Sequence, residues 1–116
     1  MPRMLIIDDE PKLCTCLQAY FTMKGLTVSV VYDGEKAINR LLRETPDVIL
    51  LDVRLPDMSG LDVLKRARDL CPQAKVIMVT AADQPDVREE AVAYGAVGYI
   101  TKPFDLSDST WSLVFA

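Results

Sequence analysis

Short apolar runs alternate along this chain with segments of helical periodicity. Four runs, at residues 4–7, 48–51, 76–79 and 97–100, are continuously apolar, and a weaker one at 27–31 includes polar residues. Continuous rather than alternating hydrophobicity is typical of strands buried on both faces, as in a parallel sheet covered by helices. The pattern therefore predicts five parallel strands.

Between these runs, apolar residues recur at intervals of three and four, which is typical of helices with one buried face. The four predicted faces consist of Leu13, Leu17, Tyr20 and Phe21; Ala37, Ile38, Leu41 and Leu42; Leu61, Leu64, Ala67 and Cys71; and Val87, Ala91 and Tyr94. Signals of helix ends agree with these boundaries: Pro11 in a first turn, Asp33 as a cap, Ser59 with Asp62 as a capping-box variant, and Gly25 and Gly95 at carboxyl ends. Five strands alternating with about five helices, joined by right-handed crossovers, predict an open, doubly wound α/β fold.

The segment after residue 105 has the weakest pattern. A helical stripe from Leu106 would need Ser109 and Thr110 on its apolar face, and Trp111–Leu113 looks partly strand-like. The aromatic and apolar residues here could pack as a short helix, pair as a strand, or join a partner chain. We predict one domain over residues 1–116, with a fifth helix at about 106–116 that is short or irregular.

Composition narrows the class of protein. Half of the residues are apolar and 26% are charged, as in ordinary globular proteins, and no apolar run approaches the about 20 residues of a membrane helix. The first residues do not form a signal peptide, so we expect a cytoplasmic location without membrane contact. The net charge of −4 and the absence of a basic tract argue against direct nucleic-acid binding by this domain.

The chain has three cysteines, Cys14, Cys16 and Cys71, and no histidine. This set is too small for a disulfide framework and does not suit a Cys/His zinc site. We therefore expect buried or half-buried thiols.

Polar residues follow four of the five predicted strands. Asp8, Asp9 and Glu10 follow the first, Asp52 the third, Thr80 the fourth, and Lys102 the fifth. Each residue alone has an ordinary explanation, as a helix cap, a loop residue or a solvated charge. However, the carboxyl ends of parallel strands share one edge of the sheet, where functional groups gather. Their convergence therefore favours a site.

Carboxylates placed together need a cation, since two charges about 4 Å apart repel by about 4 kcal/mol at an effective dielectric constant of about 20. Mg²⁺ suits Asp9 and Asp52 together with backbone carbonyls and waters. Lys102 and Thr80 could bind the oxygens of a phosphoryl group, and a carboxylate nucleophile would form an acyl phosphate.

Four sequence blocks, in this order and at this spacing, resemble the receiver domains of two-component response regulators. The blocks are Ile7-Asp8-Asp9-Glu10, the ten residues 51–60 (LDVRLPDMSG), Val79-Thr80-Ala81, and residues 95–104 (GAVGYITKPF). The resemblance runs from Met4 to about Leu106. It implies a flavodoxin-like sheet with strand order 2-1-3-4-5.

The resemblance also implies a role for each matching residue. Asp52 would be the phosphoacceptor. The metal ion, Mg²⁺ or alternatively Mn²⁺, would be bound by Asp9, Asp52 and the backbone carbonyl of Arg54, and Asp8 would hold a metal-bound water. Lys102 would contact the phosphoryl group, and Thr80 and Tyr99 would act as switch residues. Lys102–Pro103 would be a cis peptide. By the same resemblance, Arg54 and Ala82 would occupy positions that tune the lifetime of the phosphorylated state.

As a family member, the chain would be a phosphoacceptor switch and not an enzyme, although it would assist its own phosphorylation and dephosphorylation. Its donor would be a sensor histidine kinase or phosphotransfer protein, which would carry the phosphohistidine that this chain lacks. The phosphorylated form would control an output domain or a partner, or form a homodimer, through the fourth helix, fifth strand and fifth helix.

Three alternatives remain. A Mg²⁺-dependent phosphatase of the haloacid-dehalogenase type would have a second aspartate where Arg54 stands, and a cap domain. A flavodoxin-like binding module would need hydroxyl groups and glycine where Asp8-Asp9-Glu10 would repel the phosphate of FMN. A degenerate receiver that only docks would not need Asp8, Asp9, Asp52, Thr80 and Lys102, and all five are present.

Overall fold

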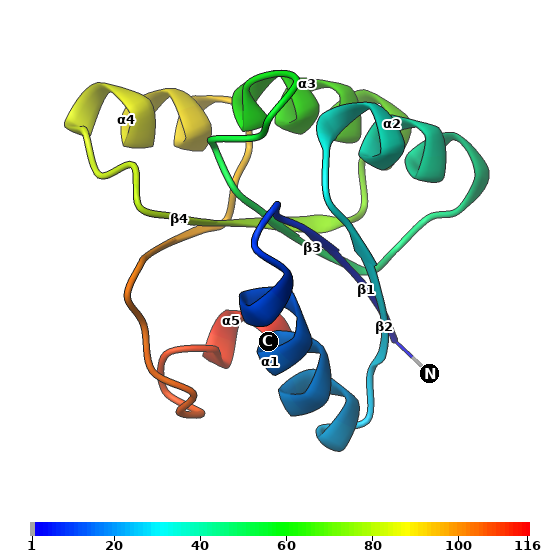
Figure 1. The fold of residues 1–116 in the computed structure, drawn as a ribbon. Coiled ribbons are helices and arrows are strands. Elements are labelled where there is room, and N and C mark those ends of the chain that lie inside the picture. Colours follow the sequence, from blue (N-terminus) through cyan, green and yellow to red (C-terminus); the bar gives the residue numbers. More distant parts are fainter. Residues whose placement is uncertain (1) are drawn as a thin grey trace.

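A computed structural model describes residues 2–116. Its strands are β1 (Arg3–Ile7), β2 (Thr27–Val31), β3 (Val48–Leu51), β4 (Lys75–Thr80) and β5 (Gly98–Thr101). Its helices are α1 (Pro11–Met23), α2 (Gly34–Arg43), α3 (Gly60–Leu70), α4 (Pro85–Ala93) and α5 (Ser112–Phe115). The strands form one parallel sheet of order β2-β1-β3-β4-β5, so the predicted fold and strand order are confirmed (Figure 1).

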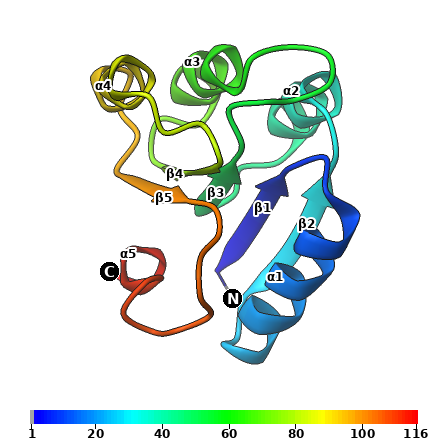
Figure 2. The ribbon, with the colours of Figure 1, turned by 60° about the vertical axis from the view of Figure 1, so that its left-hand side comes forward.

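Helices cover both faces of the sheet. α2, α3 and α4 lie on one face, and α1 and α5 lie on the other (Figures 1 and 2). Each face has its own apolar core: Leu41 and Leu64 pack under the first group of helices, while Leu17 and Phe21 pack under the second. These two layers hold the sheet rigid between them, so the loops at its carboxyl edge project from a fixed frame.

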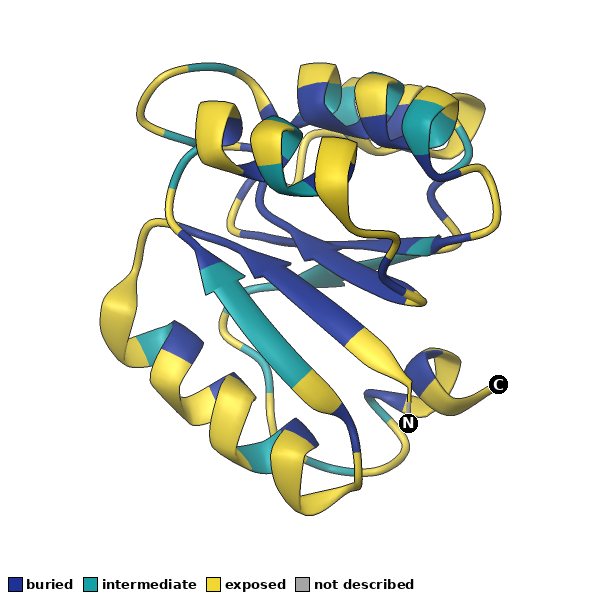
Figure 3. Ribbon diagram, turned by 90° about the vertical axis from the view of Figure 1, so that its right-hand side faces the viewer, coloured by how far each residue is buried: buried dark blue, intermediate teal, exposed yellow. Residues whose placement is uncertain are grey.

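The burial of the strands explains the strength of the apolar runs. All four residues of β3 are buried, as are all but the first of β1 and β4. β2 and β5 lie at the edges of the sheet, where most of their residues are only half-buried (Figure 3). An edge strand tolerates polar residues, which is why the run at 27–31 is the weaker signal.

The predicted helix ends are confirmed with one exception. Pro11 opens α1, the Asp33 side chain accepts a hydrogen bond from the Lys36 N–H (2.8 Å), and Gly25 and Gly95 have positive φ angles. Ser59 caps α3 by accepting from the Leu61 N–H (3.1 Å). The prediction of a capping box is wrong in its second half, in which the Asp62 side chain would accept a hydrogen bond from the Ser59 N–H. Asp62 instead lies 4.0 Å from the ammonium group of Lys65. Aspartate is one methylene shorter than the glutamate that closes such a box.

The last helix is confined to Ser112–Phe115, and residues 106–111 form a loop and a turn. The strand-like interpretation of Trp111–Leu113 is therefore wrong. Trp111 is fully buried, with its ring edge-to-face against Phe21 and Phe104 and its Nε1–H donating to the Asp105 carbonyl (2.8 Å). Packing of this indole, rather than a helical stripe, orders the segment.

Some predicted buried residues lie at the surface. Cys14 and Cys71 are buried as expected, but Cys16 is exposed, because it lies two residues from Cys14 and points away from the sheet side of α1. Leu42 and Tyr94, at the ends of their predicted faces, are also exposed. Within residues 2–116, no helix combines the length and apolar character needed to cross a membrane.

Candidate functional site

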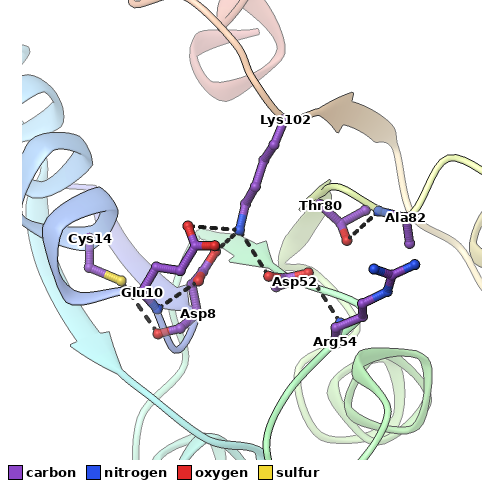
Figure 4. Close-up of polar contacts among 8 residues, drawn as sticks. All are labelled: Asp8, Glu10, Cys14, Asp52, Arg54, Thr80, Ala82 and Lys102. Atoms are coloured by element: carbon purple, nitrogen blue, oxygen red, sulfur yellow. Dashed lines mark hydrogen bonds and ion pairs between the residues drawn. The ribbon is translucent and has the colours of Figure 1, made fainter.

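Three strand ends bring three buried polar side chains together. Asp8 follows β1, Asp52 follows β3, and Thr80 is the last residue of β4, so adjacent strands of the sheet carry them to one edge (Figure 4). Asp8 is 3% exposed, Asp52 5% and Thr80 0%. Burying two carboxylates is costly unless a cation or hydrogen-bond donors compensate.

Lys102 supplies that compensation from the far side of the site. Its backbone N–H donates to the Thr80 carbonyl (2.9 Å) just beyond β5, and the Lys102–Pro103 peptide is cis. Its ammonium nitrogen Nζ lies 2.8 Å from Asp8 Oδ2 and 2.9 Å from Asp52 Oδ2. Glu10 Oε2 lies 3.5 Å from the same nitrogen. One ammonium group therefore bridges the two buried carboxylates.

The pKa values reflect this arrangement. Burial raises the pKa of Asp8, and this effect exceeds the opposite one of the hydrogen bonds that Asp8 accepts from Lys102 and from the Glu10 N–H. Burial alone would lower the pKa of Lys102, but its hydrogen bonds to Asp8 and Asp52 and the negative charges of these two groups together outweigh burial and raise the pKa above its usual range. Lys102 is therefore firmly protonated, and burial makes the charged form of Asp8 less favourable than it is in water.

Asp9 completes a cluster of oxygen donors. It is exposed, yet carboxylate oxygens of Asp8, Asp9 and Asp52 all lie within 4.8 Å of one another. Lys102 balances only part of their negative charge. A hard divalent cation prefers carboxylate oxygens at such distances and retains water on its open side, so this donor set fits Mg²⁺.

We expect Asp8→Asn to raise the free energy of unfolding of the metal-free protein by about 1 kcal/mol. Asparagine has the same shape and keeps an acceptor for the Glu10 N–H, which now bonds to Asp8 Oδ1 (3.0 Å), but it removes a buried charge beside Asp52. Urea unfolding at neutral pH measures the change. Asp9→Asn, at an exposed position, serves as the control with a smaller effect. A less stable Asp8→Asn variant would show that the ion pair with Lys102 outweighs the cost of burial.

Thr80 and Tyr99 are linked through the backbone of Ala82. The hydroxyl oxygen of Thr80 accepts a hydrogen bond from the Ala82 N–H (3.1 Å), and the Tyr99 hydroxyl donates to the Ala82 carbonyl. Tyr99 is half-buried, and the guanidinium group of Arg88 lies 4.6 Å from its ring centre. A movement of Thr80 would therefore reach Tyr99 through a single residue.

Arg54 lies beside the Asp52 carboxylate on the side away from Asp8 (Figure 4). Its backbone N–H donates to Asp52 Oδ1 (3.1 Å), and its side chain extends toward Ala82 (Figure 4). The two oxygens of Asp52 thus have different partners, Oδ1 the Arg54 amide and Oδ2 the Lys102 ammonium.

The sequence pattern assigned no role to three residues that contact or shape the site. Glu10 adds a carboxylate near Lys102, and the thiol of Cys14 donates to the Asp8 carbonyl (3.4 Å). Burial raises the pKa of Cys14 to about 12, so this thiol stays protonated. Gly60 lies against the Asp52 backbone so closely that a Cβ would overlap its carbonyl oxygen. Glu10 and Gly60 lie inside the conspicuous blocks, whereas no local signal marks Cys14.

The sequence model of the family described as "Response regulator receiver domain" matches residues 4–111. The chain belongs to this family. Receiver domains are signalling switches of two-component systems rather than conventional enzymes. The recognition of the family from its four sequence blocks is therefore confirmed.

Curated relatives of this receiver domain are longer proteins. A probable transcriptional regulatory protein, TcrX of Mycobacterium tuberculosis, is 39% identical over 105 residues, which cover 90% of this chain and 45% of TcrX. The regulatory protein AtoC of Escherichia coli is 35% identical over 106 residues, which cover 91% of this chain and 23% of AtoC. The chain thus spans about half or less of the length of these relatives.

Solved receiver domains share the fold. A CheY-like receiver domain protein from Methanospirillum hungatei superposes with a TM-score of 0.94 at 27% identity, covering 99% of this chain and 92% of that one. The response regulator protein TrrA from Thermotoga maritima, solved in complex with Mg(2+)-BeF, gives a TM-score of 0.84 at 27% identity, covering 99% and 98% of the two chains.

Proposed function

We propose that residues 1–116 form a single receiver domain that accepts a phosphoryl group on Asp52 from a histidine kinase or phosphotransfer protein. The observation that carries the proposal is the setting of Asp52. This carboxylate is buried at the end of central strand β3, is bound by Lys102 at 2.9 Å, and lies within 4.8 Å of oxygens of Asp8 and Asp9. The carboxylate of Asp52 as nucleophile, the ammonium group of Lys102 and the carboxylates that would bind a metal ion therefore lie next to one another.

Asp9, Asp52 and the backbone carbonyl of Arg54 would hold Mg²⁺, or alternatively Mn²⁺, with Asp8 binding it through water. A divalent ion at this place neutralises negative charge on phosphoryl oxygens. The donor set supports this assignment, and so does the TrrA relative, which was solved with Mg(2+)-BeF.

The reaction that we propose is a direct transfer between two side chains. An oxygen of Asp52 forms a bond to phosphorus while the bond from phosphorus to the partner's histidine nitrogen breaks, so the imidazole leaves. Lys102 would move its ammonium group from the free carboxylates to the phosphoryl oxygens, and Arg54 would keep its N–H on the Asp52 carboxyl group. The same groups would assist the later attack of water, so the domain assists its own phosphorylation and dephosphorylation.

Signalling would follow from the charge that arrives. A phosphoryl group adds about −1.5 to −2 charge and three acceptor oxygens. The Thr80 hydroxyl, which now accepts from Ala82, would donate to one of these oxygens, and the displaced Ala82 would release Tyr99 to turn inward. Tyr99 lies on β5, and Ala82 lies in the loop that leads to α4. We propose that α4, β5 and α5 transmit the change to an output domain or a second copy. The name of TcrX supports a gene-regulatory output.

Labelling with a small phosphodonor tests the proposal. Incubation with acetyl phosphate and Mg²⁺ should add the mass of one phosphoryl group to the intact protein, hydroxylamine should remove it, and EDTA should prevent it. Sustained hydrolysis of phosphomonoesters would instead indicate a phosphatase of the haloacid-dehalogenase type. Failure of labelling by both acetyl phosphate and phosphoramidate would indicate a degenerate receiver that only docks.

A further inference from the structure

The loop between β3 and α3 is held closed at its base. This loop, residues 53–59, carries Arg54 and directly follows Asp52. The Gly60 N–H donates to the Val53 carbonyl (2.6 Å), and Arg54 and Ser59 form an isolated antiparallel bridge. The two ends of the loop therefore meet beside the acceptor.

The tip of the same loop is bound to α2. Asp57 accepts hydrogen bonds from two backbone N–H groups in the first turn of that helix, from Gly34 to Oδ1 (2.8 Å) and from Glu35 to Oδ2 (2.9 Å). These bonds lower the pKa of Asp57, as expected for a carboxylate at the positive end of a helix. Met58 packs so closely on Gly34 that a Cβ on this glycine would overlap the methionine side chain. The tip of the loop is therefore held against the start of α2 by both hydrogen bonds and close packing.

These contacts go beyond what α2 needs for its own stability. The helix already has a capping residue, because Asp33 accepts from the Lys36 N–H (2.8 Å). Asp57 comes from a different element, 23 residues away from Gly34 in the chain. Its carboxylate therefore joins the loop at residues 53–59, which we call the acceptor loop, to the body of the domain. It also satisfies two N–H groups that have no partner within the helix.

We infer that Asp57 is a positioning residue for cation binding and phosphoryl transfer at Asp52. With base and tip both held, the loop has little freedom, and Arg54, which pairs with Ser59 at the base, is held in place. Its N–H donates to Asp52 Oδ1 (3.1 Å), and the position of the same residue would determine where its carbonyl meets a cation. The inference rests on the proposed function, in which that carbonyl is a ligand. Groups that orient ligands typically affect metal affinity or activity by about 10- to 100-fold when they are removed.

The two aspartates at α2 allow the positioning role to be separated from helix stability. Asp57→Ala frees the loop tip, whereas Asp33→Ala removes a cap from the same helix without touching the loop. Calorimetric titration with Mg²⁺ alone should show about 10-fold weaker binding for Asp57→Ala. Labelling by acetyl phosphate at subsaturating Mg²⁺ should slow to a similar degree, whereas Asp33→Ala should match the wild type in both. Asp57→Asn, which keeps one acceptor oxygen, should fall between.

Each outcome decides the inference. If Asp57→Ala and Asp33→Ala have the same Mg²⁺ affinity and the same labelling rate, the inference is overturned, because Asp57 would then only stabilise the helix. If Asp57→Ala does not fold, Asp57→Asn alone carries the comparison, and wild-type Mg²⁺ affinity in that variant would likewise overturn the inference. If the wild-type protein binds no Mg²⁺ and takes up no phosphoryl group, the proposed function itself fails. If the wild-type protein does both and Asp57→Ala does so equally well, only the inference about Asp57 fails.

Discussion

Asp52→Asn is expected to take up no phosphoryl group from acetyl phosphate, while it keeps the fold of the wild-type protein. Asparagine has the shape of aspartate and still offers an oxygen to the Arg54 N–H, which now donates to Asp52 Oδ1 at 3.1 Å. Its amide oxygen is a much poorer nucleophile than a carboxylate, so the acyl phosphate cannot form at this position. Intact-mass spectrometry in the presence of Mg²⁺ measures the loss directly.

The matched control for this prediction is Asp69→Asn, the same chemical change at an exposed position of α3. It should be labelled as fully as the wild-type protein. Labelling of Asp52→Asn at the wild-type level would place the acceptor elsewhere and would sink the proposed function. Near-ultraviolet circular dichroism of both variants shows that the comparison is made between folded proteins.

The sheet was predictable where burial is complete. β3 and most of β1 and β4 are buried on both faces, so their composition alone indicates strands. β2 and β5 both lie at the edges, and the run at 27–31, which forms β2, is the weaker signal. The order of the strands does not follow from any run of residues, because it depends on how the crossovers pack. The prediction of that order came from the family resemblance.

The sequence predicted which residues lie together at the site, but not which of them are buried or what each one contacts. Asp8 and Asp9 are adjacent in sequence, yet Asp8 is buried and bound to Lys102 whereas Asp9 is exposed. Alternation along the chain does not say which of two neighbours points inward beyond the end of a strand. The roles of Thr80 and Tyr99 as switch residues remain predictions, although both contact Ala82.

Contacts between distant segments were beyond the reach of local patterns. Nothing in the sequence around Asp57 indicates a partner, because its two bonds to the start of α2 depend on the tertiary fold. The segment after residue 105 has the same explanation. Its polar residues break a helical stripe, but the burial of Trp111 between Phe21 and Phe104 determines its path. At both places, contacts between distant segments determine the structure where local patterns carry no signal.

Gly60→Ala is expected to lower the free energy of unfolding by about 3 kcal/mol, toward the upper end of the range for overpacked sites. A Cβ at this position would overlap the Asp52 carbonyl oxygen and lie 2.8 Å from Val53 Cα. Both neighbours are backbone atoms, which cannot rotate away as a side chain can. Alanine is the better helix former by about 1 kcal/mol, but this gain offsets only part of the strain. Urea denaturation measures the change in stability.

Gly25→Ala provides the comparison that isolates this cause. Gly25 has a φ angle of 96°, which disfavours alanine, yet a Cβ built there would have no atom within 4 Å apart from its own residue and the two adjacent ones. Its substitution should cost about 1 kcal/mol, the price of a left-handed backbone at one residue. Because the base of the acceptor loop is pinned at Gly60, the folded fraction of Gly60→Ala should also be phosphorylated more slowly, whereas Gly25→Ala should react as the wild type does. Equal stability of the two variants would show that the loop yields easily, and would weaken the view that Asp52 is held by a rigid frame.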